Sequence, residues 1–90
     1  MKRIKAIIDG MVQGVGYRYF TLHHAEKLGL TGSVRNRWRG DVEVIAEGDE
    51  AMLKEFISIL KQGPRYSHVE DVKVTWETAS GKFNSFIIER

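Results

Sequence analysis

The sequence predicts an α+β fold in which an antiparallel sheet carries two helices on one face. Apolar residues alternate with polar ones in four stretches, which is the two-residue period of half-buried strands, and they recur at helical spacing in two others. The elements follow the order strand, helix, strand, strand, helix, strand, with a short extra strand at the end. Ninety residues with 42% hydrophobic content predict one domain, residues 1–90, with one core.

The first strand is expected over residues 4–12, where apolar side chains recur at every second position from Ile4. It runs into a glycine-rich loop, and a helix is expected from about Arg18. One side of that helix collects Tyr17, Thr21, Ala25 and Leu28. Gly29 is expected to end the helix.

A hairpin and a second helix are expected next. Val34 lies on one strand of the hairpin, Val42 and Val44 lie on the other, and Gly40 marks the turn between them. Asp49 can cap the second helix, which Gly63 and Pro64 end. Its apolar stripe consists of Met52, Leu53, Phe56, Ile57 and Leu60.

The C-terminal third is expected to supply the remaining strands. Val72, Val74 and Trp76 alternate with polar residues, and the tail FNSFIIER follows a turn at Ser80 and Gly81. The complete order is that of the split β-α-β, or ferredoxin-like, sandwich. Many unrelated functions use this architecture, so the function has to be argued from a site.

Charge and composition narrow the choice of function classes. Residues 1–39 hold eight Lys and Arg against two Asp and Glu, whereas residues 40–90 hold six against ten, within a net charge of +2. The basic half suits nucleic acid, a membrane surface or a small phosphorylated ligand, and charge alone does not separate these partners. With no cysteine and no run of eighteen apolar residues, we expect a soluble, cytoplasmic, monomeric chain without disulfides.

Metal sites are not expected. His23 and His24 are adjacent on a helix, whereas two ligands on one helical face need a spacing of three or four residues. We interpret these histidines and His68 as surface residues, and Glu43 and Glu47 as solvated strand positions. No cofactor is therefore expected.

The stretch GMVQGVGYR, residues 10–18, carries the main functional signal. Its glycines allow a ligand to approach the main chain, and it ends where a helix begins, so free N–H groups and the positive end of the helix dipole favour an anion. Arg18 adds a planar, two-pronged donor suited to phosphate oxygens. From spacing alone, a plain glycine turn with a solvated arginine explains this stretch about as well as a phosphate site does, because neither the Walker lysine pattern nor the GxGxxG spacing is present.

Two motifs resemble those of a known family. IDGMVQGVGYR is similar to the first signature of the acylphosphatases, and GSVRNRWRGDVEVIAEG to the second. The resemblance implies a ferredoxin-like enzyme that hydrolyses the carboxyl–phosphate bond of acyl phosphates. It implies that Arg18 binds phosphate and that Asn36 holds the attacking water. The phosphate loop that it implies consists of Gln13, Gly14, Val15, Gly16, Tyr17 and Arg18.

The sequence departs from the family pattern at three positions. Tyr17 replaces the usual phenylalanine, Ser33 replaces an aromatic residue, and Arg39 replaces an aspartate.

A nucleic-acid module is the first alternative function, since a row of cations could lie on one sheet face, but the aromatic run of RNA-binding sheets is absent. Those cations are Arg3, Lys5, Arg35, Arg37 and Arg39. A phosphate sensor that has lost turnover is the second alternative. The presence of both Arg18 and Asn36 argues against it.

Overall fold

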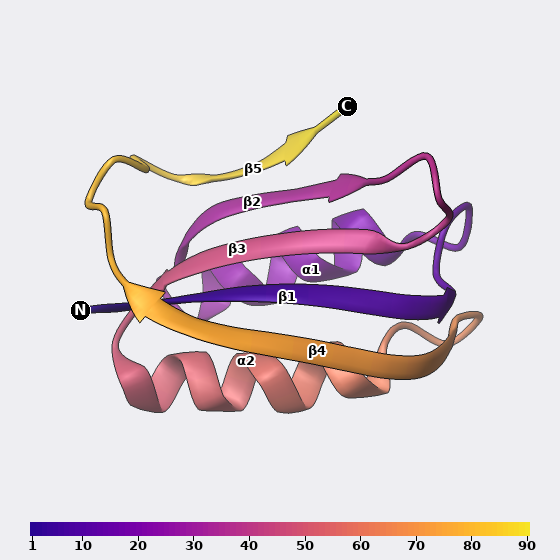
Figure 1. Cartoon of the computed structure of the whole chain (residues 1–90), viewed down its shortest axis with the longest axis horizontal. Helices are drawn as coiled ribbons and strands as arrows, with labels where there is room; N and C mark the ends of the chain where they lie inside the picture. The colour runs from indigo at the N-terminus through magenta and orange to yellow at the C-terminus, as the bar shows by residue number, and fades with distance from the viewer.

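The computed structural model describes residues 1–90 and contains five strands and two helices. The strands form one sheet in the order β4-β1-β3-β2-β5, and Figure 1 shows this arrangement. The elements are β1 (Lys2–Met11), α1 (Tyr17–Lys27), β2 (Thr31–Asn36), β3 (Val42–Gly48), α2 (Glu50–Gln62), β4 (His68–Thr78) and β5 (Phe86–Glu89). The ferredoxin-like fold predicted from the sequence is confirmed.

β1, β2, β3 and β4 pair with one another in antiparallel fashion, as predicted. β1 lies in the interior of the sheet and pairs with β3 on one side and β4 on the other, and β2 and β3 form the expected hairpin. The alternation read from the sequence is the observed one, because Ile4, Ala6 and Ile8 are fully buried. These strands therefore present one apolar face to the helices.

The fifth strand departs from the predicted antiparallel sheet, because β5 is parallel to β2 and the sheet as a whole is mixed. The cause is the direction of β4, which ends where β1 begins, with Thr78 opposite Lys2. Residues 79–85 then cross that end of the sheet to the far edge (Figure 1), where Phe86 starts opposite Gly32. The C-terminal end of β5 consequently reaches the same end of the molecule as the C-terminal end of β2.

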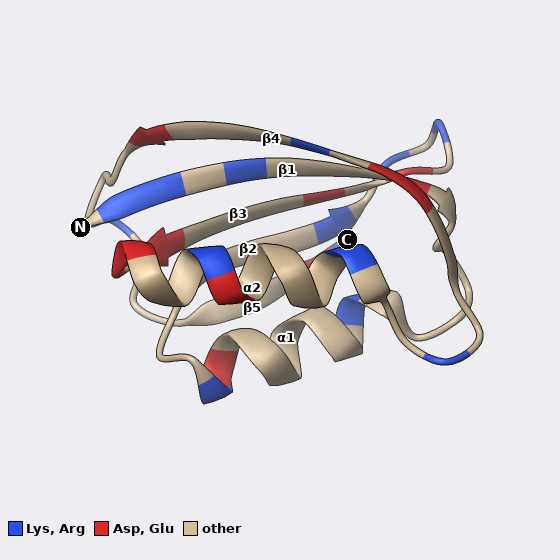
Figure 2. Cartoon of the chain, turned by 90° about the horizontal axis from the view of Figure 1, so that it is seen from below, with Lys and Arg blue, Asp and Glu red and all other residues tan.

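Both helices cover one face of the sheet, as Figure 2 shows. α1 buries Tyr17, Thr21 and Ala25 against it, and α2 buries Leu53, Phe56 and Leu60. Asp49 occupies the N-cap position of α2 as expected, but its side chain forms no capping hydrogen bond, so that part of the prediction is wrong. Neither helix has the length and hydropathy needed to cross a membrane.

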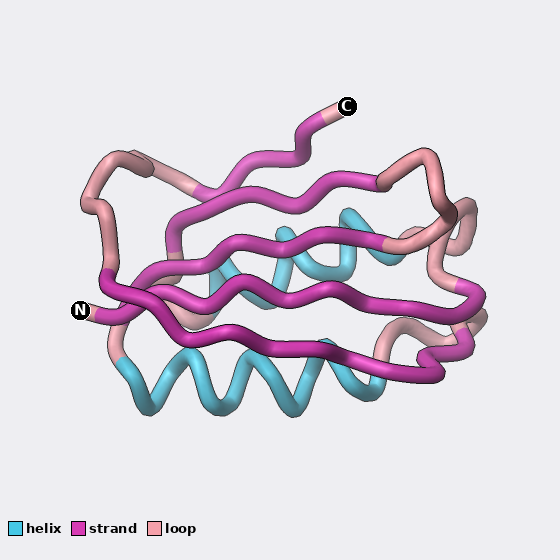
Figure 3. The backbone as a smooth tube through the Cα atoms, in the orientation of Figure 1, coloured by secondary structure: helices cyan, strands magenta, loops and turns pink.

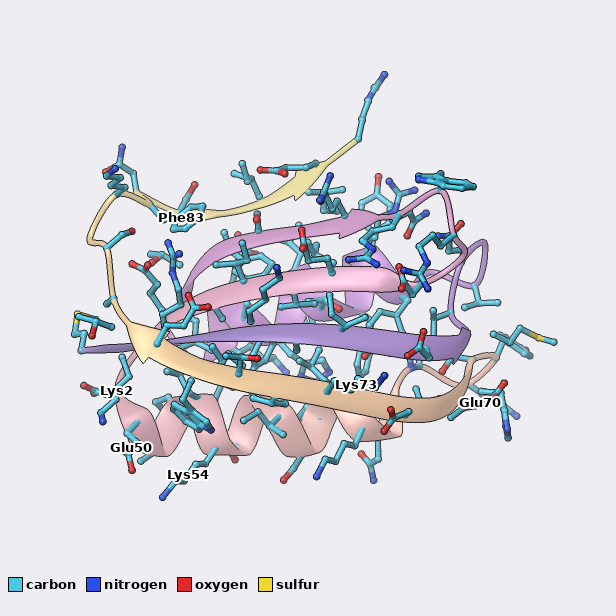
Figure 4. All side chains as sticks on the ribbon, viewed as in Figure 1. Lys2, Glu50, Lys54, Glu70, Lys73 and Phe83 are labelled. Carbon is cyan, nitrogen blue, oxygen red and sulfur yellow. The ribbon has the colours of Figure 1, made fainter.

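The outer face of the sheet carries ion pairs. The interpretation of Glu43 and Glu47 as solvated was wrong, because both are buried. Arg35 Nε lies 2.7 Å from a carboxylate oxygen of Glu43, and Arg3 Nε lies 2.7 Å from one of Glu47. Ser80 and Gly81 of the crossing segment donate hydrogen bonds to Glu47. The Arg3 guanidinium lies 5.7 Å from the centroid of the Phe83 ring, which Figure 4 labels.

Candidate active site

One end of the sheet gathers the two sequence motifs. The loop between β1 and α1 and the loop between β2 and β3 both lie there, as the pink segments at the right of Figure 3 show. Between them is a pocket of about 130 Å³, which we call the phosphate pocket because the sequence predicts phosphate binding there. Its lining residues are Val12, Gly14, Gly16, Tyr17, Arg18, Tyr19 and Asn36. Arg18 and Asn36, which lie far apart in the sequence, therefore share one pocket.

Two glycines shape the wall of this pocket that the β1–α1 loop contributes. Gly14 and Gly16 have φ of 75° and 81°, a left-handed conformation that costs other residues energy. No atom lies within 4 Å of a Cβ built on either glycine, so the backbone conformation, and not crowding, requires them. Alternating left-handed residues turn successive N–H groups toward one concavity, an arrangement that binds anions.

The start of α1 adds further unpaired donors. Its first backbone hydrogen bond runs from Phe20 N to Gly16 O at 3.0 Å, so the N–H groups of Tyr17, Arg18 and Tyr19 have no helical partner. No acidic residue occupies the first turn, and Gly16 at the N-cap has no side chain to bond these groups. The positive end of the helix dipole is thus available to an anion.

Arg18 is half-buried and has no partner within the chain. Its guanidinium takes part in no ion pair or hydrogen bond, in contrast to Arg3, Arg35 and Arg37, each of which pairs with a carboxylate. A guanidinium left unpaired beside a row of backbone donors can bind two oxygens of a phosphate.

Gln13 and Val15, two of the residues assigned to the phosphate loop, do not line the pocket. Gln13 Nε2 donates hydrogen bonds to the carbonyl oxygens of Arg37 at 2.6 Å and Asp41 at 2.9 Å. The side chain of Val15 is partly buried against the core. Gln13 therefore fastens the loop to the hairpin that carries Asn36, which is a positioning task.

Tyr17 lines the pocket, but its hydroxyl is engaged elsewhere. The ring is buried, and the hydroxyl donates a hydrogen bond of 2.6 Å to the carbonyl oxygen of Leu60 near the end of α2. In an unbroken helix that carbonyl would accept from the N–H of residue 64, which is Pro64 and has none. Burial raises the pKa of Tyr17 far above its ordinary value, so the hydroxyl stays a donor.

Asn36 is the last residue of β2, on the same face as Val34, as the alternation predicts. Its side-chain oxygen Oδ1 is buried and has no hydrogen-bond partner. Buried acceptors in folded proteins nearly always have a donor. An unpartnered amide oxygen in the wall of the phosphate pocket can accept a hydrogen bond from a bound water.

Two lining residues, Val12 and Tyr19, were missed by the sequence reasoning. Their positions at the start of the loop and directly after Arg18 were the only available signal. Of the three histidines, His24 packs its ring 4.6 Å from that of Phe20, and its pKa is lowered by burial and by the neighbouring His23 and Lys27. No cluster of three or more His, Cys, Asp or Glu side chains suited to a metal ion occurs in the chain.

Similarities to known proteins point to one family. The acylphosphatase family model matches residues 4–88. An acylphosphatase from Dehalococcoides mccartyi is 44% identical over 90 residues, which cover 99% of both chains. One from Thermus thermophilus is 48% identical over 81 residues, which cover 90% of this chain and 92% of the relative. The crystal structure of acylphosphatase from Bacillus subtilis superimposes with a TM-score of 0.97 at 41% identity over the whole of both chains. The chain therefore belongs to the acylphosphatase family and is a hydrolase that acts on acyl phosphates.

Proposed function

We propose that the enzyme cleaves the carboxyl–phosphate bond by binding the phosphoryl group in the β1–α1 loop and directing a water held by Asn36 onto it. Backbone N–H groups between Gly14 and Arg18 and the Arg18 guanidinium surround the phosphate oxygens. The observation that carries the proposal is the buried, unpartnered Oδ1 of Asn36 in the wall of the phosphate pocket.

The chemistry needs little more than these groups. The water oxygen bonds to phosphorus while the bond from phosphorus to the acyl oxygen breaks and its electrons leave with the carboxylate. Both water protons end on the phosphate product, H₂PO₄⁻. Because a carboxylate is a good leaving group and the transition state is loose, positioning and charge stabilisation supply most of the acceleration. Asn36 orients the water and takes no proton.

The proposal includes the setting of the reaction. Arg18, Asn36 and the loop all come from one chain, which supports activity as a monomer. The absence of cysteine removes any dependence on an oxidising compartment, which supports a cytoplasmic location. Four of the five cations considered for nucleic-acid binding are paired with Glu43, Glu47 or Asp41, and only Arg39 has no ion pair, which argues against nucleic acid as a partner.

The test separates binding from chemistry. Purified protein should hydrolyse acetyl phosphate equally well with and without EDTA. In Asn36→Ala we expect kcat to fall by about two to three decades, while inorganic phosphate still binds within a few-fold of the parent, because the loop and Arg18 remain. Asn84→Ala is the matched control, since Asn84 is exposed and lies before β5, at the far end of the sheet.

Three results would contradict parts of this proposal. Full turnover in Asn36→Ala would remove the assigned water-holding role. An equal loss of phosphate binding and turnover would make Asn36 a phosphate ligand. Activity that EDTA abolishes and a divalent metal restores would require a metal site, which the proposed mechanism does not contain.

A further inference from the structure

Two further hollows share lining residues with the phosphate pocket. The first, about 520 Å³, is lined by Arg18, Tyr19, Ile88 and Arg90, and we call it the β5 pocket. The second, about 360 Å³, is lined by residues 35–39 and contains Asn36 and Trp38; we call it the hairpin pocket. The β5 pocket shares Arg18 and Tyr19 with the phosphate pocket, whereas the hairpin pocket shares only Asn36 with it.

The direction of attack distinguishes these two hollows. In phosphoryl transfer the attacking and leaving oxygens lie roughly in line on opposite sides of phosphorus. If Asn36 holds the water, the acyl oxygen leaves on the side away from Asn36. The hairpin pocket has Asn36 in its wall and would therefore take the water side, whereas Asn36 is not among the residues that line the β5 pocket.

We propose that the acyl group of the substrate occupies the β5 pocket and that Tyr19 selects for acyl phosphates with an aromatic or extended apolar acyl group. This inference rests on the proposed function. Tyr19 is 72% exposed, so its ring is not committed to the core, and Ile88 contributes a second apolar surface from β5. An apolar acyl group placed between them would remove apolar surface from water on both sides.

The parallel pairing of β5 explains how this pocket arises. Val34 is opposite Ile88 in the register, and Arg90 follows Ile88 by two residues, directly after the end of β5. Ile88 and Arg90 therefore lie on the helix-covered face, next to the first turn of α1. The end of β5 reaches the site end of the molecule in Figure 1. An antiparallel fifth strand would have ended at the opposite end of the sheet.

The test compares benzoyl phosphate, which carries an aromatic acyl group, with acetyl phosphate, which carries one methyl group. We expect Tyr19→Ala to lower the ratio of kcat/KM for benzoyl phosphate over acetyl phosphate by about fivefold, the size of one aromatic contact. Tyr19→Phe keeps the ring and should keep the ratio. Trp38→Ala, which removes a ring that is 96% exposed in the hairpin pocket, should also leave the ratio unchanged.

Failure of the inference and failure of the proposed function give different results. A parent protein that hydrolyses neither compound overturns both. Hydrolysis of both compounds with an unchanged ratio in Tyr19→Ala overturns the inference alone, and so does a ratio that falls in Trp38→Ala, which would place the acyl group in the hairpin pocket. Because both side chains are exposed, circular dichroism should show all variants folded.

Discussion

Replacing Glu47 with glutamine would release the segment that crosses from β4 to β5. The Glu47 carboxylate is 3% exposed and accepts hydrogen bonds from Ser80 N at 2.8 Å, Ser80 Oγ at 2.9 Å, Gly81 N at 3.0 Å and Arg3 Nε at 2.7 Å. Burial alone would raise the pKa of Glu47, but these bonds outweigh it and hold the pKa at about 2, against an ordinary 4.5.

The sign and size of the effect follow from this lowered pKa. A carboxyl whose pKa is lower in the folded state stabilises the fold fully above pH 4.5, and this contribution is lost as the pH falls toward 2. The difference corresponds to at most about 3 kcal/mol of unfolding free energy, and partial exposure of the Arg3 partner reduces it. Glutamine carries no charge and presents an NH₂ group to these donors, so we expect Glu47→Gln to cost about 2 kcal/mol at pH 7.

Urea denaturation of parent and variant at pH 7, 5, 4, 3 and 2.5 measures this contribution. The difference in unfolding free energy should stay constant between pH 7 and 5 and shrink progressively below 4.5. Glu55→Gln is the control, because Glu55 is exposed on α2 and has no ion pair, and it should track the parent throughout. A Glu47→Gln variant as stable as the parent at pH 7, or a difference that does not shrink at low pH, would refute the reasoning.

Three further substitutions test the site and its supports. Arg18→Lys keeps the charge but loses the planar fork, so the fall in kcat/KM for acetyl phosphate should correspond to a loss of about 2 to 4 kcal/mol of transition-state stabilisation. Arg65→Lys is the control. Near-normal turnover in Arg18→Lys would show that Arg18 acts only as an electrostatic attractor. Gln13→Ala removes two hydrogen bonds between the loop and the hairpin. It should lower the unfolding free energy measured in urea by about 1 to 3 kcal/mol and raise KM. An unchanged KM would show that the loop holds its shape without these bonds. Tyr17→Phe leaves the Leu60 carbonyl without a donor and should lower the unfolding free energy by about 1 to 2 kcal/mol, and a variant as stable as the parent would show that water replaces the hydroxyl.

The sequence predicted the fold because its local signals agree with one another. Period-two strands, two helices bounded by glycines and one short hairpin leave few ways to bury the apolar faces. The direction of β5 could not be read from the tail FNSFIIER, because alternation says nothing about the partner strand. It depends on where β4 ends, and therefore on the pairing of Lys2 with Thr78.

The lining of the phosphate pocket could be predicted where its signal lies in the backbone or in a motif, and could not be predicted where it depends on tertiary contacts. Gly14, Gly16 and Arg18 form the expected loop wall, and Asn36 faces it across the pocket. The tether from Gln13 to the hairpin carbonyls is invisible in sequence, since a glutamine in a loop has no preferred partner. The same holds for the carboxylates of the outer face, whose alternation pattern predicted solvent exposure and whose arginine partners are brought alongside only by pairing between strands.

The interior position of β1 governs the order in which the molecule can assemble. Lys2 pairs with Gly48 on one side and with Thr78 on the other, so only the β2–β3 hairpin joins strands that are close in sequence. Such non-local pairing places the domain among the slower folders of its size. The phosphate pocket needs β1 seated beside β3, because the loop that follows β1 must reach Asn36. A phosphate bound there therefore acts on the finished fold, and it slows unfolding without speeding the search that precedes it.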